Sequence, residues 1–205
     1  MVGRIIIFIV MSCMISSPDP QVILFFGDSL TAGFGLAPEE AFPAIVEKNL
    51  QEKGVDVKVV NAGLSGETSA GGLSRIDWIL RQRIDLFVLE LGANDGLRGL
   101  PLDQTRKNLQ SIIDKVKTKN PACKIVLAGM MVPPNMGKDY ADNFRELYKE
   151  LTKKNKATLI PFLLEGVGGI ERLNQADGIH PTVEGHKIVA GNVTRVITPL
   201  LSESR

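Results

Sequence analysis

Residues 22–35, VILFFGDSLTAGFG, decide the fold of this chain. Val22 to Phe26 form a continuous apolar run of strand length, rich in β-branched and aromatic side chains. A strand that is apolar on both faces is typical of a parallel sheet covered by helices on both sides. Gly27 ends the run, and the polar turn after it places Ser29 at the carboxyl end of the strand, where open α/β sheets bind ligands. Ser29 is therefore a candidate nucleophile, although a serine at this position can also simply cap the next turn.

The rest of the chain alternates apolar strands with amphipathic helices. We expect strands at 55–60, 85–91, 124–128 and 158–162, and helices at 38–53, 69–82, 101–119, 139–155 and 182–201. This alternation predicts right-handed βαβ units and a parallel sheet. The expected fold class is α/β, a three-layer α/β/α sandwich of about five parallel strands with a flavodoxin-like outline. Residues 165–176 show no clear pattern and are expected to form an irregular connection.

Length and composition indicate an ordinary globular protein. The 205 residues suit one domain with a substantial core. A hydrophobic share of 44% and a charged share of 23% are typical of this class. The formal net charge of +1 provides no electrostatic signature for nucleic acid, so no nucleic-acid partner is expected. The two cysteines are too few for a disulfide framework.

Residues 1–17 have the features of an export signal. Arg4 precedes an apolar run that is too short to span a bilayer but suits the apolar segment of a signal peptide. Residues 10–13, VMSC, resemble a lipoprotein cleavage box, so a lipid anchor at Cys13 is an alternative to a cut nearer the domain. We therefore expect an exported protein, periplasmic or extracellular, with a single domain over residues 18–205. The alternative is an N-terminal extension without a targeting role.

Polar residues in several loops can together perform acyl transfer. Ser29, Gly66 and Asn94 follow the first three expected strands, and the carboxyl ends of parallel strands meet at one edge of a sheet. Asp177 and His180 precede the last helix, whose beginning should return to that edge. A serine needs a base to remove its proton, and a histidine needs a carboxylate to hold its tautomer. We therefore expect Ser29, His180 and Asp177 to act as nucleophile, base and orienting acid.

The tetrahedral intermediate of acyl transfer needs hydrogen-bond donors for its oxyanion. The backbone N–H groups of Ser29 and Gly66 and the side-chain amide of Asn94 are the expected donors. Two of them have simpler alternatives, because Gly66 can serve only to allow a positive φ and Asn94 can be a turn residue. Asp28 and Asp95 lie beside these residues and are expected to brace the loops through hydrogen bonds.

These residues fall in four blocks that resemble those of the GDSL esterases and lipases, also called SGNH hydrolases. The blocks, in the family's order, are Gly27-Asp28-Ser29-Leu30, residues 61–68 (NAGLSGET), Gly92-Ala93-Asn94-Asp95, and Asp177-Gly178-Ile179-His180-Pro181. Residues 91–99 and 132–137 resemble the bacterial arylesterase, thioesterase I and lysophospholipase subgroup, although Met136 stands where that subgroup often has an aromatic residue.

The resemblance covers residues 22–201 and implies the SGNH hydrolase fold. It implies a serine hydrolase that cleaves carboxylic esters, and by extension thioesters or lysophospholipids, through an acyl-enzyme. It implies neither a metal nor an organic cofactor. The expected partner is a small-molecule acyl ester or thioester, with membrane or lipid contact made through the substrate or through an N-terminal lipid anchor.

Apolar side chains on the same loops are candidates for one wall of an acyl-binding groove, although side chains of this kind can also merely cover the core. They are Leu64, Leu97, Leu100, Met131, Val132 and Met136. The two methionines are flexible and favour broad specificity over a tight match to one acyl chain.

The sequence fits other classes of protein less well. An α/β-hydrolase needs a G-x-S-x-G elbow, and none occurs. A flavodoxin-like protein would hold a flavin phosphate on the first loop, which leaves Asp177 and His180 without a role. A non-catalytic ligand-binding protein of the SGNH fold would hydrolyse no ester. A metal site of Asp177, His180 and His186 has no support from H-E-x-x-H or paired-cysteine spacing. His186, inside the last helix, is expected to be structural.

Overall fold

One parallel sheet of five strands organises the protein, whose computed structural model describes residues 19–202. The strands are β1 (Gln21–Gly27), β2 (Val57–Gly63), β3 (Leu86–Glu90), β4 (Lys124–Ala128) and β5 (Thr158–Ile160). Their order across the sheet is β2-β1-β3-β4-β5, which is the order of flavodoxin-like sheets. The predicted α/β class is therefore confirmed. The predictions for an export signal and for Cys13 fall on residues outside the described range.

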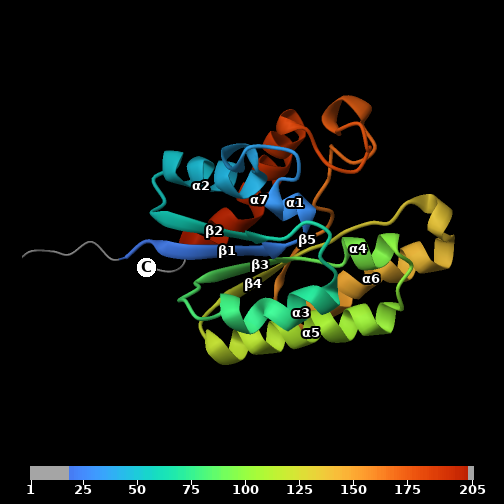
Figure 1. Ribbon diagram of the computed structural model, residues 1–205. Helices are drawn as coiled ribbons and strands as arrows, with labels where there is room; N and C mark the ends of the chain where they lie inside the picture. Colours follow the sequence, from blue (N-terminus) through green and yellow to red (C-terminus); the bar gives the residue numbers. More distant parts are fainter. Residues whose placement is uncertain (1–18, 203–205) are drawn as a thin grey trace, which may run out of the picture.

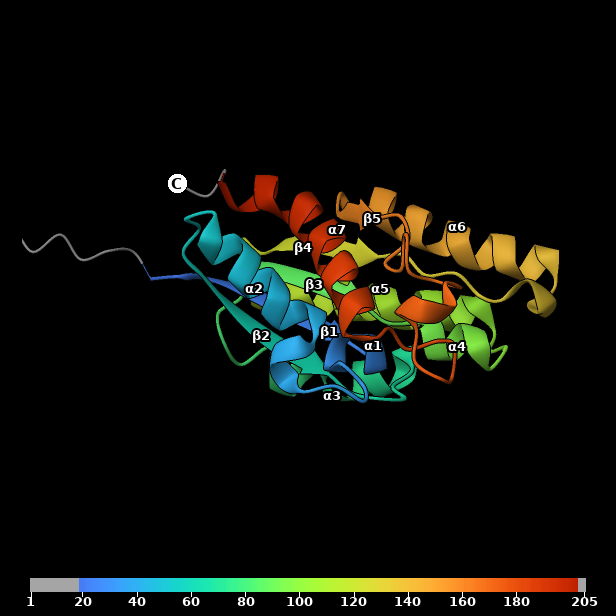
Figure 2. The same ribbon diagram turned by 90° about the horizontal axis from the view of Figure 1, so that it is seen from above.

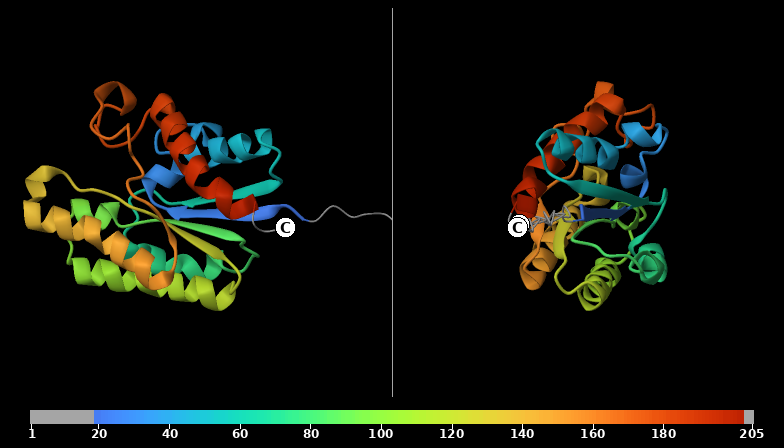
Figure 3. Two further views of the ribbon diagram at one scale, coloured as in Figure 1. Left: turned by 180° about the vertical axis from the view of Figure 1, so that it is seen from behind. Right: turned by 90° about the vertical axis from the view of Figure 1, so that its left-hand side faces the viewer.

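Helices cover both faces of the sheet. They are α1 (Ser29–Ala32), α2 (Phe42–Glu52), α3 (Ser69–Ile79), α4 (Ala93–Leu97), α5 (Leu102–Lys119), α6 (Lys138–Asn155) and α7 (Val183–Ser202), with short 3₁₀ turns η1 (Pro38–Glu40), η2 (Pro134–Met136) and η3 (Glu171–Leu173). Figure 1 and Figure 3 show α2 and α7 on one face and α3, α5 and α6 on the other. Figure 2 shows α7 beside α2, and the two helices are in contact. The three-layer sandwich is confirmed.

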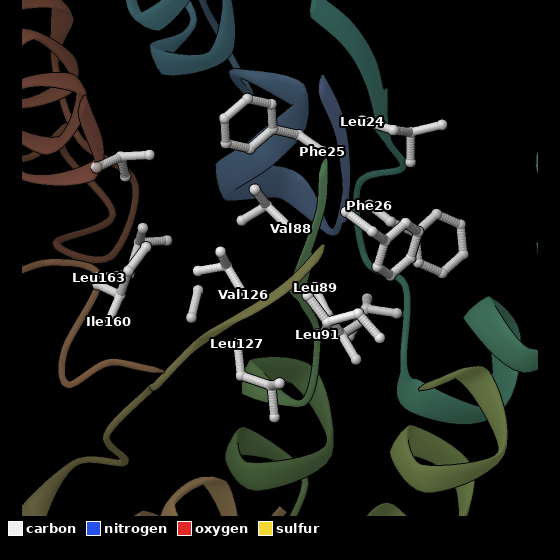
Figure 4. Close-up of a cluster of buried hydrophobic side chains, with 14 of the residues drawn as sticks. Leu24, Phe25, Phe26, Val88, Leu89, Leu91, Val126, Leu127, Ile160 and Leu163 are labelled. Atoms are coloured by element: carbon white, nitrogen blue, oxygen red, sulfur yellow. The ribbon is translucent and has the colours of Figure 1, made fainter. Parts of the chain in front are cut away.

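The interior strand β1 is buried on both faces, as its apolar sequence predicts. Phe25 contacts Phe42 of α2 edge-to-face, with ring centroids 5.4 Å apart. Phe26 packs against Phe87 of β3, with centroids 5.8 Å apart, and Figure 4 shows the two rings of β1 pointing to opposite sides of the sheet. Burial of these apolar surfaces fixes the strand that carries Ser29 at its end.

Several element boundaries differ from the predicted ones for identifiable reasons. Strand β2 continues to Gly63 because its last residues pair in parallel register with Phe25 to Gly27. The helix expected over residues 38–53 is divided, since Ala41 is extended with φ −67° and ψ 141° between η1 and α2. The loop after β3 contains helix α4, which the sequence did not predict. Over residues 19–202, no helix is long and apolar enough to cross a membrane.

Candidate active site

The turn after β1 presents Ser29 as the first residue of the short helix α1. The Asp28 carboxylate caps this helix, with Oδ1 accepting a 3.0 Å hydrogen bond from the Leu30 N–H. Gly33 ends it in the left-handed region, at φ +76°, and its N–H donates to the Ser29 carbonyl. The nucleophile candidate therefore lies in a tightly closed turn directly on a buried strand.

A continuous chain of hydrogen bonds joins Ser29 to the loop before α7. Ser29 Oγ lies 2.8 Å from His180 Nε2, and His180 Nδ1 lies 2.7 Å from Asp177 Oδ2. Hydrogen bonds from the His180 side chain and then from the backbone N–H groups of His180 and Ile179 lower the pKa of Asp177 to about 2. Because an ionised carboxylate only accepts hydrogen bonds, Nδ1 carries the ring proton and Nε2 is free to accept from Ser29. The structure thus brings together the three residues that the sequence predicts as a triad.

Contacts within the loop, and with Phe34 after α1, hold the loop that carries His180. Asp177 Oδ1 accepts from the N–H groups of Ile179 and His180, each at 3.0 Å. Gln175 donates its N–H to the His180 carbonyl at 2.7 Å and its side-chain amide to the Phe34 carbonyl at 2.7 Å. The Phe34 ring lies over the imidazole, with centroids 4.5 Å apart. Phe34 was not predicted, and a single aromatic residue in a glycine-rich loop gives little signal for such a contact.

The three expected oxyanion donors lie at this edge in two different states. The backbone N–H groups of Ser29 and Gly66 form no hydrogen bond within residues 19–202, and both residues line the same groove. The backbone at position 66 has φ +79°, a conformation that favours glycine. The two roles considered for Gly66, a positive φ and a free N–H, therefore occur together. The Asn94 amide differs from expectation, because its nitrogen already donates to Asp28 Oδ2 and to the Glu67 carbonyl, each at 3.1 Å. An oxyanion would receive a hydrogen from Asn94 only in exchange for one of these bonds.

Buried carboxylates brace the loops around these donors. Asp95 accepts from the Ser69 N–H at 2.8 Å and from the Ser69 hydroxyl at 2.6 Å, which fastens α4 to the start of α3. Glu67 forms a two-pronged ion pair with Arg75, whose guanidinium also lies 4.3 Å from the centre of the Phe26 ring. The prediction that Asp28 and Asp95 brace the loops is confirmed.

A groove of about 600 Å³ opens beside Ser29 and His180. Of the six predicted wall residues, Leu97, Met131 and Val132 line it. Phe162 and Leu164, from the segment after β5, supply another wall that the sequence did not predict. A volume of this size suits a small organic ligand, and its mainly apolar walls suit an acyl chain.

The other three predicted wall residues require a correction, because none of them lines the groove. Leu64 and Leu100 are 53% and 36% exposed on the surface of their loops. Met136 packs partly buried against the core beside Gly99. Sequence alone could not separate these residues from Leu97, since all of them lie in loops that follow strand ends at the same edge of the sheet.

Comparisons with known proteins show the family of this chain. The family described as "GDSL-like Lipase/Acylhydrolase family" matches residues 25–188. The chain belongs to the GDSL-like lipase/acylhydrolase family. Esterase TesA of Pseudomonas aeruginosa is 41% identical over 182 residues, which cover 88% of this chain and 90% of its own. Thioesterase 1/protease 1/lysophospholipase L1 of Escherichia coli (strain K12) is 36% identical over 183 residues, which cover 89% of this chain and 86% of its own. The crystal structure of TesA superposes with a TM-score of 0.84 at 41% identity, covering 88% of this chain and 100% of that one.

The second histidine of this family member plays a different part from His180. His186 is 1% exposed, and its Nδ1 accepts the Phe42 N–H at 3.0 Å, at the start of α2. Burial, and to a smaller degree the charge of His180, lower its pKa to about 4, so the ring is neutral. The expectation of a structural role is confirmed. Within residues 19–202, no three His, Cys, Asp or Glu side chains are arranged to hold a metal ion.

Glu90 is a residue of this family member's site that the sequence did not single out. It ends β3, it is fully buried, and its Oε2 accepts hydrogen bonds from the nucleophile turn. The available signal was one acidic residue in an otherwise apolar run, Leu86–Leu91. Burial of a carboxyl group is costly unless it is hydrogen-bonded, and Glu90 forms these bonds through Oε2.

Proposed function

We propose that this member of the GDSL-like lipase/acylhydrolase family hydrolyses carboxylic esters through an acyl-enzyme on Ser29. The observation that carries the proposal is the unbroken hydrogen-bonded chain from Asp177 through His180 to Ser29, at the mouth of an apolar groove. A flavodoxin-like or other non-catalytic binding function gives these hydrogen-bonded residues no role.

The proposed reaction has two halves. Ser29 Oγ attacks the carbonyl carbon while His180 Nε2 takes the hydroxyl proton, and Asp177 stabilises the resulting imidazolium. The N–H groups of Ser29 and Gly66 and the Asn94 amide stabilise the oxyanion. The intermediate collapses as the C–O or C–S bond to the leaving group breaks, and that group takes the proton from His180. In the second half, water attacks the acyl carbonyl carbon while His180 takes a proton from the water. The bond between that carbon and Ser29 Oγ then breaks, Ser29 Oγ takes the proton from His180, and the carboxylic acid leaves.

The substrate class is acyl esters with an extended apolar acyl chain, and includes thioesters and lysophospholipids. Relatives at 36–41% identity bear the names esterase, arylesterase and thioesterase/lysophospholipase. Phe34, Leu97, Met131 and Ile179 line the groove while remaining 42–47% exposed, so its mouth is apolar as well as its walls. Such a mouth suits lipid substrates, and supports contact with a lipid surface through the substrate.

Export of a mature single domain that begins near residue 18 is part of the proposal. It rests on Arg4 and the apolar run after it, with Cys13 as the alternative lipid-anchor site. Mass spectrometry of the protein expressed with its own N-terminus should show a cut in this region or a lipid on Cys13. Recovery of the intact chain from the cytosol would overturn this part.

The nucleophile is tested by Ser29→Ala together with Ser65→Ala, since Ser65 also lines the groove. Hydrolysis of a p-nitrophenyl ester should fall by about a thousandfold or more in Ser29→Ala and stay near wild type in Ser65→Ala. A p-nitrophenyl phosphonate should add its phosphonyl group to Ser29 in wild type and release p-nitrophenol. More than about a tenth of the wild-type rate in folded Ser29→Ala would show that another group attacks.

A further inference from the structure

Glu90 lies beneath the nucleophile turn without a cationic partner. It is the last residue of β3, it is 0% exposed, and no Lys, Arg or His within residues 19–202 forms an ion pair with it. Its Oε1 atom is buried with no hydrogen-bond partner among the described residues. An ionised carboxylate in such a position would carry a large desolvation cost, whereas a neutral carboxyl group carries a much smaller one.

The other oxygen of Glu90 contacts the turn on both sides of Ser29. Oε2 accepts the Asp28 N–H at 3.1 Å and the Thr31 hydroxyl at 2.8 Å. A Cβ atom at position 27 would lie 2.3 Å from Glu90 Oε2, so only glycine leaves room for the carboxyl group there. The absence of a side chain at Gly27 therefore leaves the space that the Glu90 carboxyl group occupies.

Asp28 continues these contacts to the oxyanion side. Its Oδ1 accepts from the Leu30 N–H at 3.0 Å, and its Oδ2 accepts from the Asn94 amide at 3.1 Å. Glu90 thus fixes the backbone of Asp28, and Asp28 fixes the amide of Asn94. One buried carboxyl group on β3 connects the orientation of the nucleophile with that of a proposed oxyanion donor.

We propose that Glu90 is a positioning residue that holds the Ser29 turn in register as a neutral carboxyl group. This inference rests on the proposed function of Ser29. It assigns Glu90 no contact with the substrate, and predicts that its hydrogen-bonding oxygen matters while its negative charge does not.

The surrounding charges support the neutral form. Burial and then the negative charge of Asp28 raise the pKa of Glu90 well above its usual range, while burial raises the pKa of Asp28 to about 6. The other titratable groups that interact with the pair are Tyr148 of α6 and His180 of the loop before α7, and Asp95 of α4 interacts in turn with Tyr148. At neutral pH the charge of the pair therefore resides on Asp28, whose carboxylate has two donors, and Glu90 remains protonated.

The test compares Glu90→Gln with Glu90→Leu. The glutamine oxygen can accept from Asp28 and Thr31, so kcat should stay within about threefold of wild type, with an unmoved acid limb of the kcat–pH profile. Leucine has similar bulk and no acceptor, so kcat should fall by about thirtyfold with little change in KM. Difference infrared spectroscopy at pH 7 should show the carbonyl band of a buried protonated carboxyl group in wild type and not in Glu90→Gln.

A matched pair at Thr31 keeps the test decisive if Glu90→Leu does not fold. Thr31→Val removes one of the two donors to Glu90 without changing shape and should lower kcat severalfold, whereas Thr31→Ser keeps the hydroxyl and should not. A wild-type kcat in Thr31→Val would overturn the inference when Glu90→Leu does not fold, and a wild-type kcat in both variants would overturn it when Glu90→Leu folds. So would a Glu90→Gln variant as slow as Glu90→Leu, or one whose acid limb moves to lower pH, because the loss of a true negative charge would favour deprotonation of the groups around it. Ser29→Ala in the same assay separates these results from a failure of the proposed function. If the proposed function is wrong, Ser29→Ala keeps its turnover; if only the inference about Glu90 is wrong, Ser29→Ala is inactive.

Discussion

The two ends of the Ser29–His180–Asp177 chain are held in opposite ways. Ser29 lies between Asp28 and Thr31, which are 1% and 0% exposed, and both contact Glu90 some 60 residues away in the sequence. Asp177 and His180 are three residues apart in a surface loop, and the Asp177 side chain is 38% exposed. The nucleophile is positioned by the core, whereas its base is positioned by a local turn.

The same chemical group behaves differently in these two places. Burial raises the pKa of the Asp28 carboxyl to about 6, whereas hydrogen bonds from His180 and its neighbours lower that of Asp177 to about 2. The carboxyl group near water is thus ionised over the whole neutral range and can stabilise an imidazolium. The buried carboxyl groups of Asp28 and Glu90 instead fix the backbone of the nucleophile turn, because they accept hydrogen bonds from the Leu30 and Asp28 N–H groups.

At the solvent-exposed end of the triad, the largest effect on kcat is expected for Asp177→Asn. The amide oxygen can still accept from the Ile179 and His180 N–H groups, but its NH₂ would face His180 Nδ1. The imidazole would then carry its proton on Nε2 and could not accept from Ser29, so kcat should fall by about a thousandfold or more at an unchanged unfolding temperature. Steady-state kinetics and thermal unfolding check this. A loss below about tenfold would mean that the carboxylate only braces the loop.

The different supports explain which parts of the site the sequence could predict. Asp177 and His180 are neighbours in the chain, so their pairing is visible in one pentapeptide. Ser29, Gly66 and Asn94 could be predicted because strand ends of a parallel sheet converge, a rule that needs no side-chain detail.

Contacts that depend on three-dimensional packing could not be predicted. Glu90 gives no motif, since its partners are a backbone N–H and a hydroxyl on another strand's turn. Phe162 lines the groove only because the segment after β5 folds back toward Ser29, whereas Met136 turns to the core. The helix α4 was missed because Gly92 at φ +114° starts it without any capping side chain.

A smaller effect is expected on the buried side, for Asn94→Ala. Removal of one oxyanion donor should lower kcat by roughly a hundredfold and leave KM nearly unchanged. Its bond to Asp28 adds a second expectation, because Asn94→Asp would place a carboxylate against Asp28 Oδ2 and should be slower than Asn94→Ala. Kinetics of both variants check this. A raised KM at constant kcat in Asn94→Ala would mean that Asn94 binds substrate in its ground state.

The two histidines extend the comparison from catalysis to stability. His186 has a folded-state pKa of about 4, below the unfolded value of about 6.5, so the unfolded chain binds the proton more readily between these values. Its contribution to stability is fully present above pH 6.5 or so, and is lost as the pH falls through about 4, on the order of 3 kcal/mol in total.

Denaturant unfolding at several pH values measures this contribution. His186→Gln keeps an acceptor for the Phe42 N–H and should flatten the pH dependence without abolishing hydrolysis. His180→Gln should do the reverse, abolishing hydrolysis and keeping most of this pH dependence, because burial is the larger cause of the lowered pKa of His186. An equally steep loss of stability in His186→Gln would assign the effect to other groups.

The smallest effect concerns the groove, where neither the core nor a local turn fixes the ligand. Each CH₂ of an acyl chain that becomes buried should add at most about 0.8 kcal/mol of binding, and less beside a wall that stays partly in water. We therefore expect kcat/KM to rise severalfold from acetyl to octanoyl p-nitrophenyl esters and thioesters.

Leu97 and Leu100 form a matched pair, because both are leucines of one loop with 42% and 36% exposure, but only Leu97 lines the groove. Leu97→Asn should reduce the octanoyl-to-acetyl ratio of kcat/KM severalfold, while Leu100→Asn should leave it unchanged. Equal effects of the two substitutions would mean that chain length is sensed at the apolar mouth as a whole, and a wild-type rate that falls with chain length would assign the protein to short acyl groups.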